Sequence, residues 1–421
     1  MPSFPGMDLN DHYRLLLGLD GAWKVSDVRL DVAGRNVDIY LEHVGDGAPC
    51  PVCGRSCRLH DHAPERRWRH LDTMQFTTTV HATPPRTDCP EHGVKTAEVP
   101  WAGRNARFTL LFEAFAVEVI RACRNVKDAA GLLRLDWHST FQIMERAVQR
   151  GLSRRRPEEI PWVGIDEKSF LRGRKFVSLL TDVEGRRVLD VEPGRDSQVA
   201  KTLIDKALDR FQRDMVCGVA MDLSAPFEKA VREKLPNADV VADRFHVTKL
   251  LADAVDKVRR RESAILAKRH DNRLKRTKYL WLAGMEHLSP ENLALFEDLS
   301  RQSLLVAKAW RVKYAFEAFW TRRDKTFARQ YFRHWFKEAV ATGLPPVVKA
   351  AQSLKRHLEK LLSWYDSFIS NALTEGMNSK IQALKANARG YRAFENYRTA
   401  ILFSCGRLDM SPLPGNALAT P

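Results

Sequence analysis

Three acidic residues stand where the sequence predicts the edge of a buried element. Asp166 ends a predicted strand in VGIDEKSF, Asp222 ends another in CGVAMDLSA, and Glu375 opens a predicted helix in NALTEGMNSK. Any one such acid is usually a turn or cap residue. Three carboxylates converging on one sheet edge, however, can hold two divalent ions about 3.5 to 4 Å apart, which together clamp a phosphodiester. The hard carboxylate oxygens favour Mg²⁺, with Mn²⁺ as a substitute.

The helix that begins near Glu375 carries further polar candidates. Asn378 falls on the same face as Glu375 by helical spacing, so we expect it to support the metal site. Lys380, Lys385 and Arg389 project elsewhere and are candidates for binding nucleic-acid phosphates. The alternative for these three is an ordinary solvated face.

Two short-spaced pairs of soft ligands predict a second, different metal site. Cys50 and Cys53 form the first pair and Cys89 and His92 the second, with two residues between the ligands of each pair. Brought together by folding, the four donors form the tetrahedron of a closed structural Zn²⁺ site, with no coordination position left for water. Alternative ligands between the pairs are Cys57, His60, His62 and His70. The alternative for those is an exposed polar side chain or a nucleic-acid contact.

The elements that must position these residues fall into distinct regions. Two strands are predicted in WKVSDVRLDV and NVDIYLEHV, with a turn at Ala33-Gly34. Residues 112–152 contain three amphipathic helices with short connections, the outline of a helix-turn-helix. The residues that begin its third helix, which enters the major groove in this motif, are Trp137, His138, Ser139 and Thr140.

The region from residue 160 predicts a mixed α/β sheet followed by a long helical stretch. WVGIDEKSF, KFVSLLTDV and RRVLDVEPG are apolar runs typical of a strand and a hairpin, and strand–helix alternation follows through MVCGVAMDLSA, PFEKAVREKLP and ADVVADRFHV. From about Val247 to Tyr365 the pattern is helical, and its tryptophans are more typical of a core than of base stacking. A final helical segment breaks near Gly390.

Composition narrows the class of protein further. The 421 residues carry a formal net charge of +16, which favours a polyanionic partner such as nucleic acid. The sequence contains neither an apolar run of the roughly 18 to 20 residues that a membrane span needs nor a secretory signal. We therefore expect a cytoplasmic protein, in which clustered cysteines bind metal more often than they form disulfides.

Several of these motifs together resemble the bacterial insertion-sequence transposases of the ISL3 family. The motifs are CPVCG, GIDEKSF, AMDLSAPFEKAVREKLPNADVVADRFHVTKLL and LTEGMNSKIQALKANARGYRAFENYR, which cover nearly the whole chain in order. The resemblance implies an RNase H-like catalytic fold with Asp166, Asp222 and Glu375 as a DDE triad. It also implies supporting roles for Asp243 and His246, for which the alternative is structural hydrogen bonding. One departure is His92, where relatives are expected to have a second Cys-x-x-Cys pair.

The resulting expectation is a multidomain α+β protein with a zinc-binding module, a helix-turn-helix and an RNase H-like mixed α/β catalytic domain interrupted by an all-helical insertion. The expected domains are 1–105 (strands and zinc), 108–152 (helix-turn-helix), 160–250 (catalytic, first part), 251–365 (insertion), 366–410 (catalytic, last part) and 411–421 (tail).

The expected function is binding of double-stranded DNA, namely transposon-end inverted repeats and target DNA, followed by metal-dependent strand cleavage and transfer. The resemblance to DDE transposases implies a homodimer or larger synaptic complex, because two ends must be held at once. The expected location is the bacterial cytoplasm, in association with the nucleoid. The alternatives are a transposase-derived DNA-binding regulator without activity and a nuclease that does not join strands.

Overall fold

The computed structural model describes residues 8–19, 21–171, 175–368 and 372–413, without the side chains of residues 171, 175 and 372–375. The chain divides into two compact units. The first runs to Arg155 and includes the segment from Leu408 onward, and the second spans Arg156–Arg407. The sequence placed 408–410 with the catalytic domain, whereas their contacts place them in the first unit. In the described part of the chain, no helix is long and apolar enough to cross a membrane.

The first unit opens with two small sheets, preceded by α1 (Leu9–Leu16). Their strand orders are β1-β2-β6-β5 and β3-β4-β7-β8. The predicted pair β1 (Trp23–Asp31) and β2 (Asn36–His43) is antiparallel. The remaining strands are β3 (Gly47–Pro49), β4 (Ser56–His62), β5 (Arg66–Arg69), β6 (Thr77–Ala82), β7 (Pro85–Cys89) and β8 (Gly93–Thr96). Alternating apolar residues such as Ile39, Trp68 and Val80 are fully buried and form the core.

Three helices follow in the positions that the sequence predicts. They are α2 (Leu110–Ala122), α3 (Val126–Leu133) and α4 (Trp137–Ser153). Each begins after a residue whose side chain accepts a hydrogen bond from the first turn, namely Thr109, Asn125 and Asp136. Arg134, in the turn between α3 and α4, has a φ of 53° and ends α3 in the left-handed conformation.

The second unit is built on a sheet of order β11-β10-β9-β12-β13. The strands are β9 (Trp162–Leu171), β10 (Lys175–Asp182), β11 (Arg187–Pro193), β12 (Gly218–Met221) and β13 (Asp239–Ala242). β10 is antiparallel to both β11 and β9, while β12 is parallel to β9 and β13 parallel to β12. The sheet is therefore mixed, as the sequence predicts.

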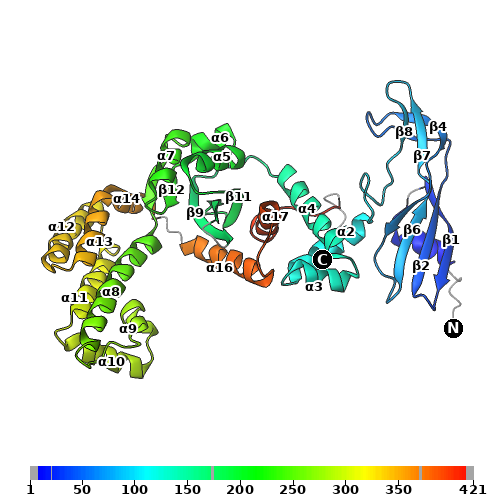
Figure 1. Ribbon diagram of the computed structural model, residues 1–421. Coiled ribbons are helices and arrows are strands. Elements are labelled where there is room, and N and C mark those ends of the chain that lie inside the picture. Colours follow the sequence, from blue (N-terminus) through cyan, green and yellow to red (C-terminus); the bar gives the residue numbers. More distant parts are fainter. Residues whose placement is uncertain (1–7, 20, 172–174, 369–371, 414–421) are drawn as a thin grey trace, which may run out of the picture. The chain divides into compact units, whose positions relative to one another are not determined.

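Helices cover the sheet of the second unit (Figure 1). α5 (Ser197–Ala207), α6 (Arg210–Met215) and α7 (Ala225–Lys234) come between β11 and β13 in the chain. Val163 and Ile165 of β9 are fully buried in the same core as α5 and α7. α16 (Ala372–Asn387) and α17 (Phe394–Cys405) come later, and Phe170 of β9 stacks on Tyr397 of α17. Because side chains alternate along a strand, Phe170 and Ile165 point to opposite faces, and α17 lies across the sheet from α5 and α7.

The predicted strand ADVVADRFHV is shorter than expected. Strand β13 ends at Ala242, and Arg244 begins the helix α8 (Arg244–Ala267). The physical reason is Asp243, whose side chain accepts a hydrogen bond from the backbone N–H of Phe245 at 3.0 Å and so caps the helix. The apolar Phe245 and Val247, which extend the strand pattern, are helical.

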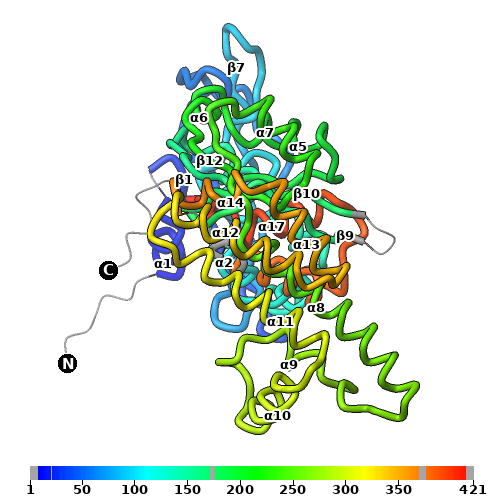
Figure 2. The backbone as a smooth tube through the Cα atoms, turned by 90° about the vertical axis from the view of Figure 1, so that its left-hand side faces the viewer, coloured from blue at the N-terminus to red at the C-terminus, as the bar shows by residue number. Residues whose placement is uncertain are grey.

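The rest of the second unit is helical up to Ser367. Its elements after α8 are α9 (Lys278–Leu282), η1 (Met285–His287), α10 (Pro290–Arg301), α11 (Leu305–Phe316), η2 (Glu317–Phe319), α12 (Lys325–Ala341), α13 (Pro345–Arg356), α14 (Leu358–Leu362) and α15 (Trp364–Ser367). α8, α11 and α13 pack side by side (Figures 1 and 2). The tryptophans Trp281, Trp320 and Trp335 are almost completely buried in this segment, so the prediction that they form its core is confirmed.

Candidate catalytic and metal-binding sites

Three aspartates lie in a row across three parallel strands. Strand pairing sets Ile165 of β9 beside Met221 of β12, and Met221 beside Ala242 of β13. The next residue on each strand is an aspartate, so Asp166, Asp222 and Asp243 follow in register at the same edge. Neighbouring strands are about 4.8 Å apart, which brings these carboxylates within reach of one another.

Asp166 differs from its predicted position, because β9 continues beyond it to Leu171 while the paired partner β12 stops at Met221. Its carboxylate is largely buried and has three neighbours. Oδ1 accepts a hydrogen bond from the backbone N–H of Glu167 at 2.7 Å. Oδ2 accepts one from Asn378 Nδ2 at 3.0 Å and lies 2.6 Å from Lys168 Nζ. Asn378 thus lies where helical spacing predicts, beside the first acid, whereas the contact with Lys168 was missed.

Asp222 is partly buried directly after β12, and its Oδ1 accepts a hydrogen bond from the backbone N–H of Ser224 at 3.1 Å. Burial raises the pKa of Asp222, and the carboxylates of Glu167 and Asp166 raise it further, against the opposing effect of His246. In the described part of the chain, Asp222 forms no ion pair with a lysine or arginine. Carboxylates that raise one another's pKa at one edge of a sheet are a donor set that fits a divalent cation.

Asp243 and His246 form an ion pair at the end of this row. Asp243 is 5 % exposed, and its Oδ2 lies 2.6 Å from His246 Nδ1. The hydrogen bond to Asp243 raises the pKa of His246, and the charges of Asp243, Asp166 and Asp222 act in the same direction against burial. The Asp-x-x-His element therefore lies beside the predicted acids.

Glu375 lies in α16, but its side chain is outside what the structure describes. The helix itself is held against β9 by Asn378 and by Lys385, whose Nζ donates to the carbonyl of Ser169 at 2.7 Å. Lys380 donates to the carbonyl of Ser404 at 2.7 Å. Of these two predicted phosphate ligands Lys380 is exposed and Lys385 is half-buried, and both donate to backbone carbonyls. Arg389 follows the helix with a φ of 54°.

The second predicted site brings its four ligands together. One donor atom from each of Cys50, Cys53, Cys89 and His92 lies within 4.8 Å of every other. Cys53 Sγ and Cys89 Sγ are 3.8 Å apart, and Cys89 Sγ and His92 Nδ1 are 3.5 Å apart. Zinc–sulfur bonds of about 2.3 Å in a tetrahedron place two sulfurs about 3.8 Å apart. The four ligands therefore fit zinc.

The backbone around the cysteines favours thiolates. Although burial opposes it, the backbone N–H groups of Glu91 and His92 help to lower the pKa of Cys89 to about 7. The backbone N–H groups of Cys53 and Val52 lower the pKa of Cys50. Thiolates are the form that binds zinc, so these turns favour the ligand form of Cys50 and Cys89. Although the backbone N–H of Arg55 opposes it, burial and the neighbouring cysteines raise the pKa of Cys53.

The residues between the two pairs lie outside this ligand cluster. Cys57 is buried beside Cys50 and Cys89, but its Sγ donates to the carbonyl of Arg55 at 3.3 Å. His70 is buried against Thr109 at 2.8 Å, and burial lowers its pKa to about 4. His60 and His62 are exposed on β4.

Of the four DNA-contacting residues predicted at the start of α4, two are exposed and two are buried. Trp137 is 45 % exposed, and His138 is exposed beside it. Ser139 and Thr140 are buried, and both hydroxyls donate to the capping residue Asp136, at 2.6 and 3.0 Å. The structure therefore leaves only the first two free to reach a DNA groove, because the cap that starts the helix uses the others.

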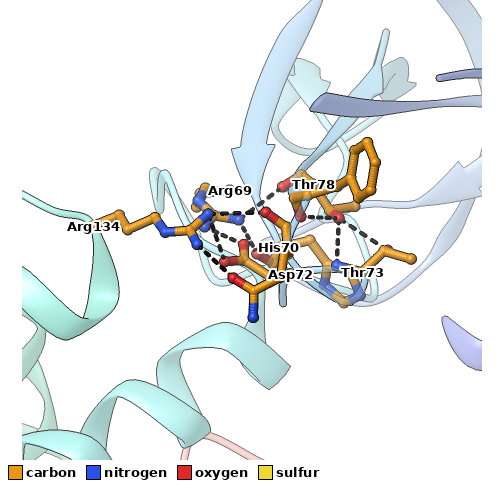
Figure 3. Close-up of polar contacts among 8 residues, drawn as sticks. Arg69, His70, Asp72, Thr73, Thr78 and Arg134 are labelled. Carbon is orange, nitrogen blue, oxygen red and sulfur yellow. Dashed lines mark hydrogen bonds and ion pairs between the residues drawn. The ribbon is translucent and has the colours of Figure 1, made fainter. Parts of the chain in front are cut away.

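A polar junction joins the sheets of the first unit to its helices (Figure 3). Arg134, at the end of α3, donates to the carbonyl and to the side chain of Gln75 at 3.0 and 3.1 Å. It also lies 3.7 Å from Asp72, which pairs with Arg69. Because Arg69 belongs to β5, the junction connects the sheet carrying Trp68 to the helix-turn-helix.

Models of known families match three regions of the chain. A family model described as a transposase, the ISL3 type of DDE transposase, matches residues 163–401, more than half of the chain. A model of the helix-turn-helix domain of transposase family ISL3 matches residues 97–148. A zinc-finger model of the transposases of IS204, IS1001, IS1096 and IS1165 matches residues 46–92.

Curated relatives match along nearly their whole length. The chain is 26% identical to the transposase for insertion sequence element IS1001 of Bordetella parapertussis, over 91% of this chain and 93% of the relative. It is 25% identical to the transposase for insertion sequence element IS1557 of Mycobacterium tuberculosis, over 90% of this chain and 92% of the relative. The protein is a transposase with a zinc ribbon and a DNA-binding helix-turn-helix. It belongs to the ISL3 family of insertion-sequence transposases.

Proposed function

We propose that this transposase binds the ends of an insertion sequence and catalyses metal-dependent cleavage and transfer of DNA strands. The single observation that carries the proposal is the registered row of Asp166, Asp222 and Asp243 on three neighbouring parallel strands, with Asn378 of α16 on the first of them. The helix that supplies Asn378 also carries Glu375, one turn earlier, which we propose as the third acid of the triad.

The domain assignment follows from the same elements. The strand order β11-β10-β9-β12-β13, with an antiparallel half and a parallel half, supports an RNase H-like catalytic domain. The helical stretch between β13 and α16 would then be an insertion between the second acid and the glutamate. We assign residues 1–105 to zinc and strands, and 108–152 to the helix-turn-helix.

The proposed chemistry uses each residue in a defined place. Asp166, Asp222 and Glu375 would hold Mg²⁺ or Mn²⁺, which supplies the positive charge that activates the attacking oxygen and stabilises the leaving one. Asn378 fixes the orientation of the Asp166 carboxylate, and the hydrogen-bonded Asp243–His246 pair supports the end of the row. The zinc site is structural, because all four ligands come from the protein.

DNA recognition is assigned to the first unit. Trp137 and His138 at the exposed start of α4 are proposed to enter a major groove at the transposon end. Lys380, Lys385 and Arg389 would contact DNA phosphates near the cleavage site. Because two ends must be held at once, we propose a homodimer or larger synaptic complex.

The test combines binding with chemistry. Purified protein is incubated with DNA carrying the element's ends and Mg²⁺ or Mn²⁺, beside Asp222→Ala and a control at an exposed aspartate of the same sheet, Asp239→Ala. End cleavage and joining by the wild type and the control, lost in Asp222→Ala while DNA binding persists, supports the proposal. Specific end binding without products from the wild type would instead favour a DNA-binding regulator, and cleavage without joining would favour a nuclease.

A further inference from the structure

Lys168 forms an ion pair with Asp166, one of the carboxylates that are proposed to bind metal. Lys168 Nζ lies 2.6 Å from Asp166 Oδ2, the same oxygen that Asn378 contacts. The lysine side chain is 17% exposed and that of the aspartate 11%, so the ion pair is sheltered from water. Lys168 is two residues from Asp166, and the alternation of a strand puts both on the face of α16 and α17.

The surroundings explain why a cation is held there. Burial raises the pKa of Asp222, and Glu167 and Asp166 lie close enough to Asp222 for their charges to raise it further. A lysine ammonium inside such a cluster compensates part of the negative charge. Without it, the buried carboxylate of Asp166 would keep its neutral hydrogen bonds and its weaker interaction with His246, but no direct ion pair.

A divalent ion and the ammonium cannot both contact the same oxygen, because like charges at such short range repel strongly in a partly buried site. We propose that Lys168 holds Asp166 in the metal-free protein, leaves it when a divalent ion binds, and then places its ammonium on the phosphate at the cleavage site. This inference rests on the proposed function, because it requires Asp166 to be a metal ligand.

The chemistry of lysine suits such an exchange. Its ammonium is a compact point charge on a flexible four-carbon stem, so it can turn from one anion to another while its backbone stays in β9. The second anion would be the phosphodiester of the DNA substrate, which is cleaved at the edge of the sheet where Asp166 and Asp222 lie. An arginine would grip the carboxylate with two parallel hydrogen bonds and release it less readily.

The first experiment measures metal binding without DNA. The zinc-loaded full-length protein is titrated with Mn²⁺ by calorimetry and by electron paramagnetic resonance, comparing wild type, Lys168→Met and Lys168→Arg. The matched control is Lys201→Met, which removes a lysine of similar exposure, 15%, that pairs with Glu233 away from the acids. We expect Lys168→Met to bind Mn²⁺ about tenfold more tightly, from loss of a competing ion pair. Lys201→Met should match the wild type, and Lys168→Arg should bind no more tightly than the wild type.

The second experiment measures end cleavage at saturating Mn²⁺, where differences in metal affinity no longer matter. Lys168→Met should cleave at least about tenfold more slowly, because the charge-assisted contact to the phosphate is lost. Thermal unfolding checks that each variant is folded, and Lys168→Arg provides a charged variant if the methionine variant is not. Tighter binding joined to slower cleavage is a combination that a purely structural lysine would not produce.

The two experiments distinguish failure of the proposed role of Lys168 from failure of the proposed function. If Lys168→Met binds Mn²⁺ and cleaves like Lys201→Met while the wild type does both, the role of Lys168 is wrong and the proposed function stands. The proposed metal site itself fails if the wild type does not cleave DNA and Asp166→Asn does not reduce its binding of Mn²⁺.

Discussion

Asn378 Nδ2 donates a hydrogen bond to Asp166 Oδ2 at 3.0 Å, although 212 residues separate the two in the chain. This contact brings α16 to the strand that carries the first acid. Because residues three apart share a face of a helix, it also sets the backbone of Glu375 on the turn nearest the row of aspartates. The site is therefore assembled from segments on both sides of the long helical stretch.

Replacing Asn378 should weaken metal-dependent chemistry without affecting DNA binding. Asn378→Ala removes the donor that orients Asp166, and loss of such a partner of a metal ligand typically costs about 10- to 100-fold in affinity or activity. The rate of end cleavage at limiting Mg²⁺ measures it. The matched control is Asn387→Ala, an exposed asparagine at the end of the same helix on the opposite face, which should leave the rate unchanged. A wild-type rate in Asn378→Ala would show that the hydrogen bond has no role in positioning the acid.

Removal of a zinc ligand should unfold the ribbon. Cys50→Ser replaces a buried thiolate, so the purified protein should lose its stoichiometric zinc and unfold at a lower temperature. His92→Cys should keep the metal, because it supplies another soft ligand at the same position. Zinc content by mass spectrometry and thermal unfolding report both results.

Cys57, which is buried beside the zinc ligands, tests which cysteines bind the metal. Its Sγ donates to a backbone carbonyl, outside the cluster of four ligands. Cys57→Ser should therefore retain full zinc content. If it loses zinc while Cys50→Ser retains it, the assignment of ligands is wrong.

Arg134 affects stability in two ways, through its left-handed backbone and through its side-chain contacts, and two substitutions can separate these effects. Its left-handed backbone costs a non-glycine residue about 1 kcal/mol, which glycine avoids, while its side chain binds Gln75 and Asp72. Arg134→Ala loses the contacts and keeps the strain, whereas Arg134→Gly loses the contacts and relieves it. Chemical denaturation should find the glycine variant more stable than the alanine variant by about 1 kcal/mol. Equal stabilities would mean that the turn relaxes once the side chain is gone.

His70 predicts an acid-sensitive first unit. Burial, together with the charge of Arg69, lowers its pKa to about 4 in the folded protein, against about 6.5 in an unfolded chain. Between these values the unfolded chain binds the proton and the folded chain does not, so stability falls as the pH drops from about 6.5 to about 4. The full loss is about 3 kcal/mol. His70→Asn should flatten this part of the unfolding free energy measured against pH, whereas an unchanged slope would assign the acid sensitivity to other groups.

Much of this architecture could be predicted from local sequence. The alternating runs of β1 and β2 and the three helices of residues 110–153 lie where periodicity places them, because each element buries one regular face. Spacing alone also identified Cys50, Cys53, Cys89 and His92, since two short chelating pairs leave few other arrangements. Asn378 was found by helical spacing from Glu375.

Other features depend on contacts that no local pattern contains. The strand predicted through Val247 ends at Ala242, because the capping side chain of Asp243 outweighs the apolar pattern. Burial of Ser139 and Thr140 follows from the same kind of cap at Asp136. Only strand alternation hints at the pairing of Lys168 with Asp166, since it puts both on one face. The return of the C-terminal segment to α4, where Arg150 donates to the carbonyl of Met410 at 2.8 Å, joins residues 260 positions apart.

The most direct test of the account exchanges the ligand atom at Asp222. A cysteine there offers a soft sulfur, which binds Mg²⁺ poorly but accepts Mn²⁺ or Cd²⁺. Asp222→Cys should bind transposon-end DNA normally, fail to cleave it with Mg²⁺, and recover measurable cleavage when Mn²⁺ or Cd²⁺ is supplied. Cleavage by Asp222→Cys in Mg²⁺ at the wild-type rate would contradict the claim that this carboxylate binds the catalytic metal.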